Sequence, residues 1–262
     1  MAKPWLTMMT IGPLLAACLT LAAQSPPAAG DGSLRAAYLK ANPAHVVQDP
    51  AGGELRGVAV DLARELARRR GVAVTLMGLD SPQGVLDAVR EGKADIGFVA
   101  YNPERAGPVE FSQPYLLVQQ TFLVASASTI RSVADLDRAG RKVGATQGDS
   151  IALYLRRNLK QAELVELTAL SPAQVLRLLA DGAVDAFGAN RQRLTDFLKG
   201  ADGVRLLPDD LYGVEQTIIV PAGRRDALDA LNLFIDEVRR SGFIDASIRR
   251  SGVIGIAAAG PR

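Results

Sequence analysis

The residue types that carry most enzyme and metal chemistry are scarce in this chain. Its 262 residues include one Cys, Cys18, and one His, His45. The chain therefore cannot form an internal disulfide or a zinc site built from Cys and His. A Ser-His-Asp triad would have to use His45, which lies in an apolar loop, and a lone His is usually structural. The composition thus argues against zinc enzymes and against hydrolases of this type.

Asp149 and Ser150 stand at a position that suits an anionic group. They follow Gly148 at the start of a predicted helix, where free backbone N–H groups and the helix dipole favour negative charge. Asp149 can equally fill this position itself as the helix N-cap. If Asp149 instead points into a binding cleft, it repels an anionic ligand and favours a cationic one.

The overall charge argues against a nucleic-acid partner. Lys plus Arg number 30 and Asp plus Glu number 28, which gives a net charge of +2. No basic stripe with interleaved aromatic residues is present in the sequence. The length favours two domains or one large domain.

The elements that must position these residues alternate between short strands and amphipathic helices, which is typical of an α/β fold. Strands are predicted over 34–38, 72–77, 94–99, 122–125, 142–145, 163–167, 184–187 and 216–220. Helices are predicted over 58–70, 81–91, 149–159, 171–181 and 224–241, and Ser132 to Asp135 resembles a capping box. One pattern recurs, because Gly92 to Asp95 and Gly182 to Asp185 each follow a helix and open a strand. This echo suggests two α/β lobes of similar design, each with a mostly parallel sheet.

Residues 1–24 have the pattern of a secretory signal peptide, and 25–32 form a Pro-rich linker. Leu15 to Cys18 resembles a bacterial lipobox, in which Cys18 becomes the acylated first residue. Cleavage after Ala23 is the rival interpretation, and an uncleaved membrane anchor is a third. We expect the mature protein to face an extracytoplasmic space.

Five short motifs occur in an order that resembles the periplasmic solute-binding proteins of ABC importers, family 3, the polar amino-acid-binding type. The motifs are GELRGVAVDLA (53–63), EGKAD (91–95), PER (103–105), VEFSQPY (109–115) and KVGATQG (142–148). The resemblance runs from about Leu34 to Gly252. It implies the two-lobed type II periplasmic binding protein fold, with two mostly parallel or mixed sheets, flanking helices and a two-strand hinge. Lobe 1 is expected over 33–121 plus 218–258, and lobe 2 over 122–217.

The resemblance also implies a ligand site between the lobes. In the family, the Arg of the Pro-Glu-Arg motif holds the ligand's α-carboxylate, which fits the fork of donors on Arg105. The turn that carries Asp149 and Ser150 belongs to the family's ligand contacts as well. We therefore expect Arg105, Asp149 and Ser150 at the cleft.

The chain departs from the family at three places in this site. Amino-acid binders hold the ligand's ammonium with an Asp where this chain has Asn190, and Arg191 adds a positive charge beside it. The stacking aromatic of the family falls near Asn42, and the stretch that ends in Tyr101 and Asn102 lacks the family's hydroxyl pair. Tyr101 either replaces the lost aromatic or is a buried structural residue. Such a cleft suits a small polar carboxylate with neutral hydrogen-bonding groups.

We expect a monomeric, non-enzymatic protein that captures such a solute, an amino acid or a related organic acid, and delivers it to an ABC permease. No cofactor, metal or nucleic acid is expected, and membrane contact only through a lipid anchor or the permease. Two alternatives stay open. One is an extracytoplasmic enzyme of the same fold, similar to cyclohexadienyl dehydratase, whose general acid would have to be Asp149 or Glu215. The other is a ligand-sensing domain.

Overall fold

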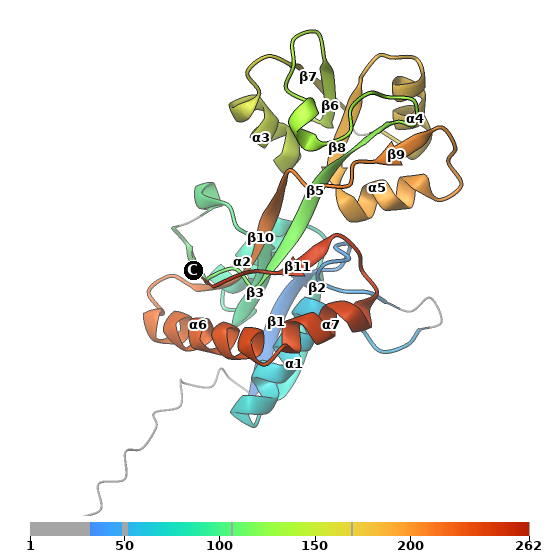
Figure 1. Ribbon diagram of the computed structural model, residues 1–262. Coiled ribbons are helices and arrows are strands. Elements are labelled where there is room, and N and C mark those ends of the chain that lie inside the picture. Colours follow the sequence, from blue (N-terminus) through green and yellow to red (C-terminus); the bar gives the residue numbers. More distant parts are fainter. Residues whose placement is uncertain (1–31, 49–51, 106, 169, 262) are drawn as a thin grey trace, which may run out of the picture.

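Two α/β lobes, joined by a pair of long strands, make up the part of the chain that the computed structural model describes (Figure 1). The described residues are 32–48, 52–105, 107–168 and 170–261. The predicted signal peptide, the lipid attachment at Cys18 and nearly all of the linker lie outside them. Within these ranges no helix has the length and hydropathy needed to cross a membrane.

Lobe 1 is built on three parallel strands in the order β2-β1-β3, with β10 antiparallel beside β3. Its strands are β1 (Ser33–Leu39), β2 (Ala73–Leu79), β3 (Ile96–Ala100), β4 (Val109–Phe111) and β10 (Tyr212–Pro221). Its helices are α1 (Val58–Arg70), α2 (Pro82–Arg90), α6 (Arg225–Arg240) and α7 (Phe243–Ser251). One apolar cluster packs α1, α6 and α7 on one face of the sheet, and another packs α2 on the opposite face. The sheet is therefore covered on both faces, as parallel strands require.

Lobe 2 repeats this plan with β7-β6-β8 in parallel and β5 antiparallel beside β8. Its strands are β5 (Leu116–Ala125), β6 (Lys142–Thr146), β7 (Glu163–Leu167), β8 (Ala186–Asn190) and β9 (Val204–Leu206). Its helices are α3 (Ser150–Asn158), α4 (Pro172–Ala180) and α5 (Arg191–Leu198). Separate apolar clusters again lie under α3 on one face and under α4 and α5 on the other.

The recurring Gly-to-Asp pattern makes the same contact in both lobes. The carboxylate of Asp95 accepts from the backbone N–H of Arg35 at 2.8 Å and from its guanidinium at 2.7 Å. Asp185 accepts from the backbone N–H of Lys142 at 2.8 Å and from the guanidinium of Arg141 at 3.2 Å. Each Asp thus ties the start of its own strand to the start of the neighbouring parallel strand. The echo in the sequence reflects a real structural repeat.

The crossing strands β5 and β10 pair antiparallel with each other, Leu116–Gln120 against Tyr212–Gln216. This pairing joins the two predicted sheets into one continuous ladder. The strand β5 contributes apolar side chains to both lobes, with Leu116 in the core of lobe 1 and Phe122 in the core of lobe 2, whereas β10 contributes Ile218 and Val220 to the core of lobe 1. The lobe boundaries at 121/122 and 217/218 stay predictions.

The strand and helix predictions hold best where the pattern is strongly periodic. The bounds of α1 and β7 are as predicted, Ser81 caps α2, and Ser132 and Asp135 form the expected capping box. The prediction of β5 as 122–125 was too short, because its first half is half-buried and holds two glutamines. The helix α5 was not predicted, since its eight residues are mostly polar. The strands β4, β9 and β11 (Ile256–Ala258) have three residues each, too few for a period to show.

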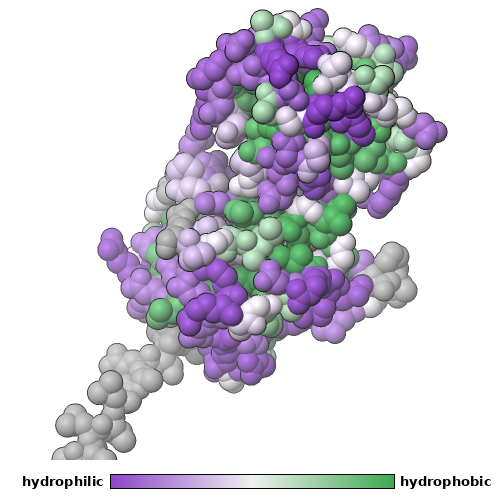
Figure 2. All heavy atoms as spheres, in the orientation of Figure 1, coloured by the Kyte–Doolittle hydropathy of each residue, from purple (hydrophilic) through white to green (hydrophobic). Residues whose placement is uncertain are grey.

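Polar and apolar residues are unevenly spread on the face drawn in Figure 2. Polar residues cover most of this side of lobe 2, and apolar residues gather on lobe 1 next to the junction. Ile254, just before β11, is 45% exposed. The junction between the lobes is therefore bordered by an apolar edge on this side.

His45 is a buried polar anchor in the turn after β1. Its side chain is fully buried, and the Leu39 backbone N–H donates to its Nδ1 at 3.3 Å. Because Nδ1 accepts, the ring proton lies on Nε2, which is 3.0 Å from Gln216 Oε1 on β10 and donates to it. Burial lowers the pKa of His45 to about 4, against a weaker opposing effect of the Gln216 hydrogen bond. The imidazole is thus neutral in the folded protein at neutral pH.

Gly188→Ala is expected to destabilise lobe 2. A Cβ at Gly188 would lie 2.7 Å from Ile151 Cδ1 and 2.8 Å from Phe122 Cε1, and such overpacking costs about 1–3 kcal/mol. The matched control is Gly84→Ala in α2, where the nearest atom is 3.4 Å away and Ala favours the helix. Urea unfolding of both variants measures the difference. Equal stability of the two variants would contradict the packing of β8.

The neutral His45 makes stability depend on pH. Its pKa is about 4 when folded against an ordinary 6.5, so the unfolded chain binds more protons between these values. Stability therefore falls as pH drops from about 6.5 to about 4, by on the order of 3 kcal/mol from this group. Urea unfolding from pH 4.5 to 7 should give a steeper dependence for the native chain than for His45→Asn. Parallel pH profiles would show that His45 does not titrate in this way.

Candidate ligand-binding cleft

A cavity of about 310 Å³ lies where the two lobes meet the crossing strands. Lobe 1 contributes the loop after β1 and the start of α2, and lobe 2 contributes the starts of α3 and α5. The crossing strands β5 and β10 contribute the lining residues that lie between the two lobes. The lining is Leu39, Ala41, Asn42, Pro43, Pro82, Ala100, Val118, Gln120, Ser150, Asn190, Val214 and Gln216.

Three of the predicted ligand residues, Asn42, Ser150 and Asn190, line this cavity together. The Oδ1 of Asn42 accepts from the backbone N–H of Ala44 at 3.0 Å. The Oδ1 of Asn190 accepts from the backbone N–H of Arg193 at 2.8 Å and so caps α5. In both amides the oxygen is occupied by the backbone, which leaves the NH2 group as the part that can donate to a ligand.

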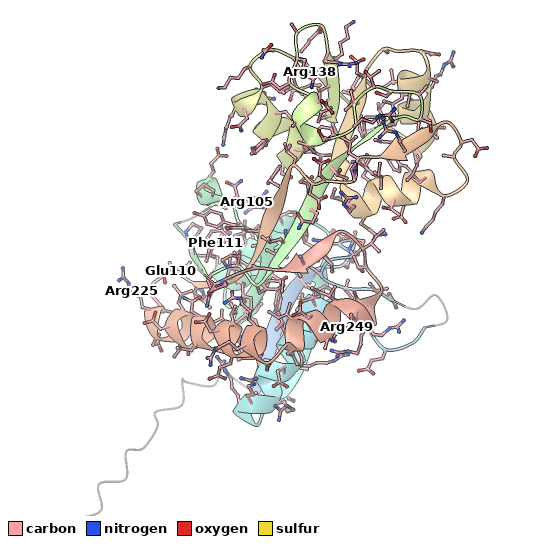
Figure 3. All side chains as sticks on the ribbon, in the orientation of Figure 1. Arg105, Glu110, Phe111, Arg138, Arg225 and Arg249 are labelled. Carbon is pink, nitrogen blue, oxygen red and sulfur yellow. The ribbon has the colours of Figure 1, made fainter. Side chains whose placement is uncertain are left out.

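The other lobe 1 residues predicted for the site lie in the loop that continues from Ala100, outside the cavity lining. Arg105 ends the short 3-10 helix Pro103–Arg105, and Figure 3 places it on lobe 1 at the level of the junction, near Phe111. Asn102 holds this helix, because its Oδ1 accepts from the backbone N–H of Glu104 at 2.9 Å. Tyr101 is 42% exposed and packs edge-to-face on Phe111, so it is not the buried structural residue that was one of its two interpretations.

Asp149 occupies the N-cap position of α3, but its side chain makes no capping hydrogen bond. Its carboxylate instead pairs with the guanidinium of Arg193 at 3.3 Å. Burial raises the pKa of Asp149, and the Arg193 charge works in the opposite direction. The negative charge of Asp149 at the start of α3 is therefore balanced by a positive charge of lobe 2. Asp149 is not among the residues that line the cavity.

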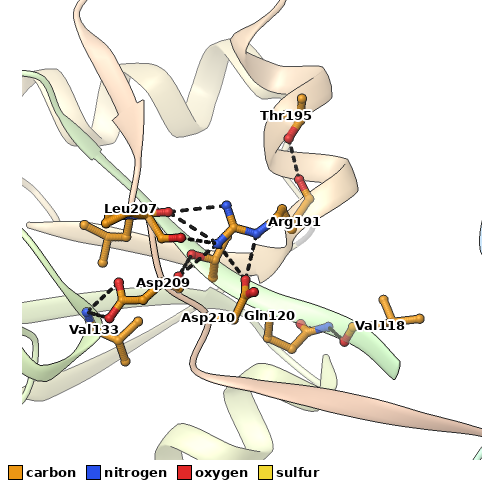
Figure 4. A network of polar contacts seen from close by, with 10 residues as sticks. Val118, Gln120, Val133, Arg191, Thr195, Leu207, Asp209 and Asp210 are labelled. Carbon is orange, nitrogen blue, oxygen red and sulfur yellow. Dashed lines mark hydrogen bonds and ion pairs between the residues drawn. The ribbon is translucent and has the colours of Figure 1, made fainter. Parts of the chain in front are cut away.

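The positive charge of Arg191, next to Asn190, is also taken up within lobe 2 (Figure 4). Its guanidinium pairs with Asp210 at 2.6 Å and donates to the backbone carbonyl of Asp209 at 2.9 Å. The sequence placed this charge beside the ligand site, and the structure shows it bound to the loop before β10.

The floor of the cavity is formed by the crossing-strand residues Val118, Gln120, Val214 and Gln216. Two of them, Gln120 and Gln216, were not predicted from the sequence as part of the site. They lie on β5 and β10 and are 4% and 2% exposed. The Nε2 of Gln120 donates to the Val118 carbonyl at 3.2 Å, and Gln216 Oε1 accepts from His45. Each apolar segment that forms a crossing strand contains a glutamine. Because a buried amide needs a hydrogen-bond partner, these glutamines could have indicated a polar site on the strands.

A larger cavity, about 630 Å³, lies at the other end of the lobe 1 strands. It borders Ser33, the first residue of the seven-residue β1, about 20 Å from the cleft end of this strand. Three of its four arginines have carboxylate partners: Arg35 with Asp95, Arg69 with Glu65 and Glu237, and Arg224 with Asp226. The fourth, Arg70, ends α1, where positive charge suits the helix carbonyls. The cavity between the lobes is therefore the better candidate for a ligand.

The cleft is electrically neutral in its lining. Of the residues in the described part of the chain that line it, five have polar side chains, all amides or hydroxyls, and none ionises. Glu215 stands between Val214 and Gln216, which both face the cavity, so the alternation along a strand directs its side chain to the other face. Among the described residues no group of three or more His, Cys, Asp or Glu could hold a metal ion. The arrangement suits binding by hydrogen bonds.

Comparison with known proteins identifies the family. Residues 34–251 match the model of bacterial extracellular solute-binding proteins, family 3. The L-cystine-binding protein TcyJ of Escherichia coli is 26% identical over 199 residues, which cover 74% of this chain and 73% of that protein.

Solved structures give the same result. A binding component of an ABC transporter from Wolinella succinogenes, described as putative and solved with lysine, has a TM-score of 0.64 at 26% identity and covers 84% of this chain and 95% of its own. An ancestral cyclohexadienyl dehydratase shares the fold, with a TM-score of 0.55 at 23% identity over 84% of this chain and 92% of its own. With the two-lobed type II periplasmic binding protein fold and a cleft at the hinge, these matches show that the chain belongs to the family 3 extracellular solute-binding proteins of bacteria.

Proposed function

We propose that this protein captures a small polar solute with a carboxylate, an amino acid or related organic acid, and delivers it to an ABC permease. The observation that carries the proposal is the cavity between the lobes, whose polar lining comes from lobe 1, lobe 2 and both crossing strands. A solute that contacts all three parts favours the closed arrangement of the lobes.

Arg105 is proposed to hold the carboxylate. It lies in the loop that leaves the cavity at Ala100, and neither Asn42 nor Asn190 carries a charge that would compete with it. The amide NH2 groups of these two residues add donors from opposite lobes. A carboxylate accepts from a guanidinium and from amides.

We propose a binding role rather than catalysis. Dehydration needs a general acid within hydrogen-bond reach of the leaving group. Of the two acids considered for this role, Asp149 is paired with Arg193, and Glu215 points away from the cavity by strand alternation. We also propose that the protein is a monomer that presents its closed lobes to the permease and works outside the cytoplasm, which its match to extracellular solute-binding proteins supports.

The first test is isothermal titration calorimetry of the purified chain, freed of copurifying solute, against amino acids and small organic acids. Saturable binding to at least one carboxylate is expected, and methyl esterification of that carboxylate should abolish it. No binding to any member of either set would contradict the proposal. Turnover of a bound solute, followed by chromatography, would replace the binding role by catalysis.

The second test is Arg105→Ala. The loss of a charge-assisted partner is expected to weaken binding of the carboxylate solute by about 2–3 kcal/mol without loss of fold. The matched control is Arg249→Ala, an exposed residue near the end of α7 that Figure 3 shows far from Arg105. If both variants bind as the native chain does, Arg105 has no part in the site.

A further inference from the structure

We propose that Gln120 and Gln216, the two buried glutamines of the crossing strands, select a solute whose side chain ends in an uncharged hydrogen-bonding group such as an amide. This inference rests on the proposed function and concerns the part of the solute that lies away from the carboxylate. The inference is based on the side chains that form the floor of the cavity. None of these residues belongs to the family motifs described above.

The two glutamines are held in place and are still able to bind. Gln120 donates from Nε2 to the Val118 carbonyl at 3.2 Å, and no group of the described chain donates to its Oε1. Gln216 receives the His45 proton on Oε1, and one of its two N–H groups lies 3.4 Å from the Val214 carbonyl. Gln120 thus presents an acceptor, and Gln216 retains an N–H to donate. An amide on the solute can use both, because it has a carbonyl and an NH2 group.

His45 acts on this floor as a positioning residue. Its Nδ1 is occupied by the Leu39 N–H, so its Nε2–H fixes which end of the Gln216 amide faces the ring. With Oε1 turned to His45, the NH2 of Gln216 is the part left for the cavity.

The charges around the cavity exclude a basic side chain from the floor. Within the described ranges no carboxylate lines the cavity, Asp149 is paired with Arg193, and Asp210 is paired with Arg191. Burying an ammonium or guanidinium without a partner is unfavourable. An apolar side chain is also disfavoured, because it would cover Gln120 Oε1 without a hydrogen bond.

The experiment compares three probes by calorimetry: L-glutamine, L-methionine of similar length without the amide, and L-lysine. The native chain should bind glutamine at least about tenfold more tightly than methionine, and about 100-fold more tightly than lysine. Gln120→Leu and Gln216→Leu should bring the glutamine-to-methionine ratio close to one. Gln119→Leu is the matched control, since Gln119 lies between two cavity residues on β5 and faces the other way; it should leave the ratio unchanged.

Two further variants separate chemistry from folding. Gln120→Glu keeps the shape and adds a carboxylate, so lysine binding should rise relative to glutamine by about tenfold or more. His45→Asn should lower the glutamine-to-methionine ratio, whereas a purely structural role would weaken both probes equally.

Equal binding of glutamine and methionine to the native chain, or a ratio that survives both leucine variants, overturns the inference and leaves the solute-binding proposal intact. If organic acids bind and no amino acid does, the inference fails alone. If nothing binds, both fail.

Discussion

The antiparallel pairing of β5 with β10 is the contact on which the rest of the structure depends. It is the ladder through which the two parallel sheets become one, and β5 carries core residues of both lobes. The same segments, Leu116–Gln120 and Tyr212–Gln216, form the floor of the cavity. A change in the twist of these two strands would move the lobes and the floor together, and we propose that this couples binding at the floor to closure.

The second constraint is electrostatic. Three charged residues of lobe 2, Asp149, Arg191 and Arg193, lie close to the cleft. Each forms an ion pair within lobe 2, and none of them lines the cavity. What remains for the solute is a set of amides and a hydroxyl. Amides have fixed donor and acceptor ends, so a site built from them discriminates by hydrogen-bond pattern more than by charge.

The fold was largely predictable from the sequence, and the lining of the cavity only in part. Helices such as α1 and α4 have clear apolar periodicity and end signals, and the Asp95 and Asp185 repeat revealed the two-lobed plan. Ser150 was placed in the cleft because the family's ligand contacts include its turn, and Asn42 and Asn190 because they stand where the family has other ligand-binding residues. The position of Arg105 outside the cavity lining and the pairing of Asp149 with Arg193 depend on contacts between residues far apart in the chain, which no local pattern encodes. The same holds for His45, which was expected to be structural, but whose hydrogen bond to Gln216, 171 positions away, was not predicted.

The proposal that the two lobes close on a bound solute is tested most directly by measuring the distance between the lobes with and without solute. Spin labels at Gln83→Cys in α2 and Leu153→Cys in α3, with Cys18 replaced by Ser, would lie on opposite sides of the cleft, since Pro82 and Ser150 line it. Double electron–electron resonance should give a shorter and narrower distance distribution when the solute saturates the site. An unchanged distribution at saturation would contradict a two-lobed clamp that closes on its ligand.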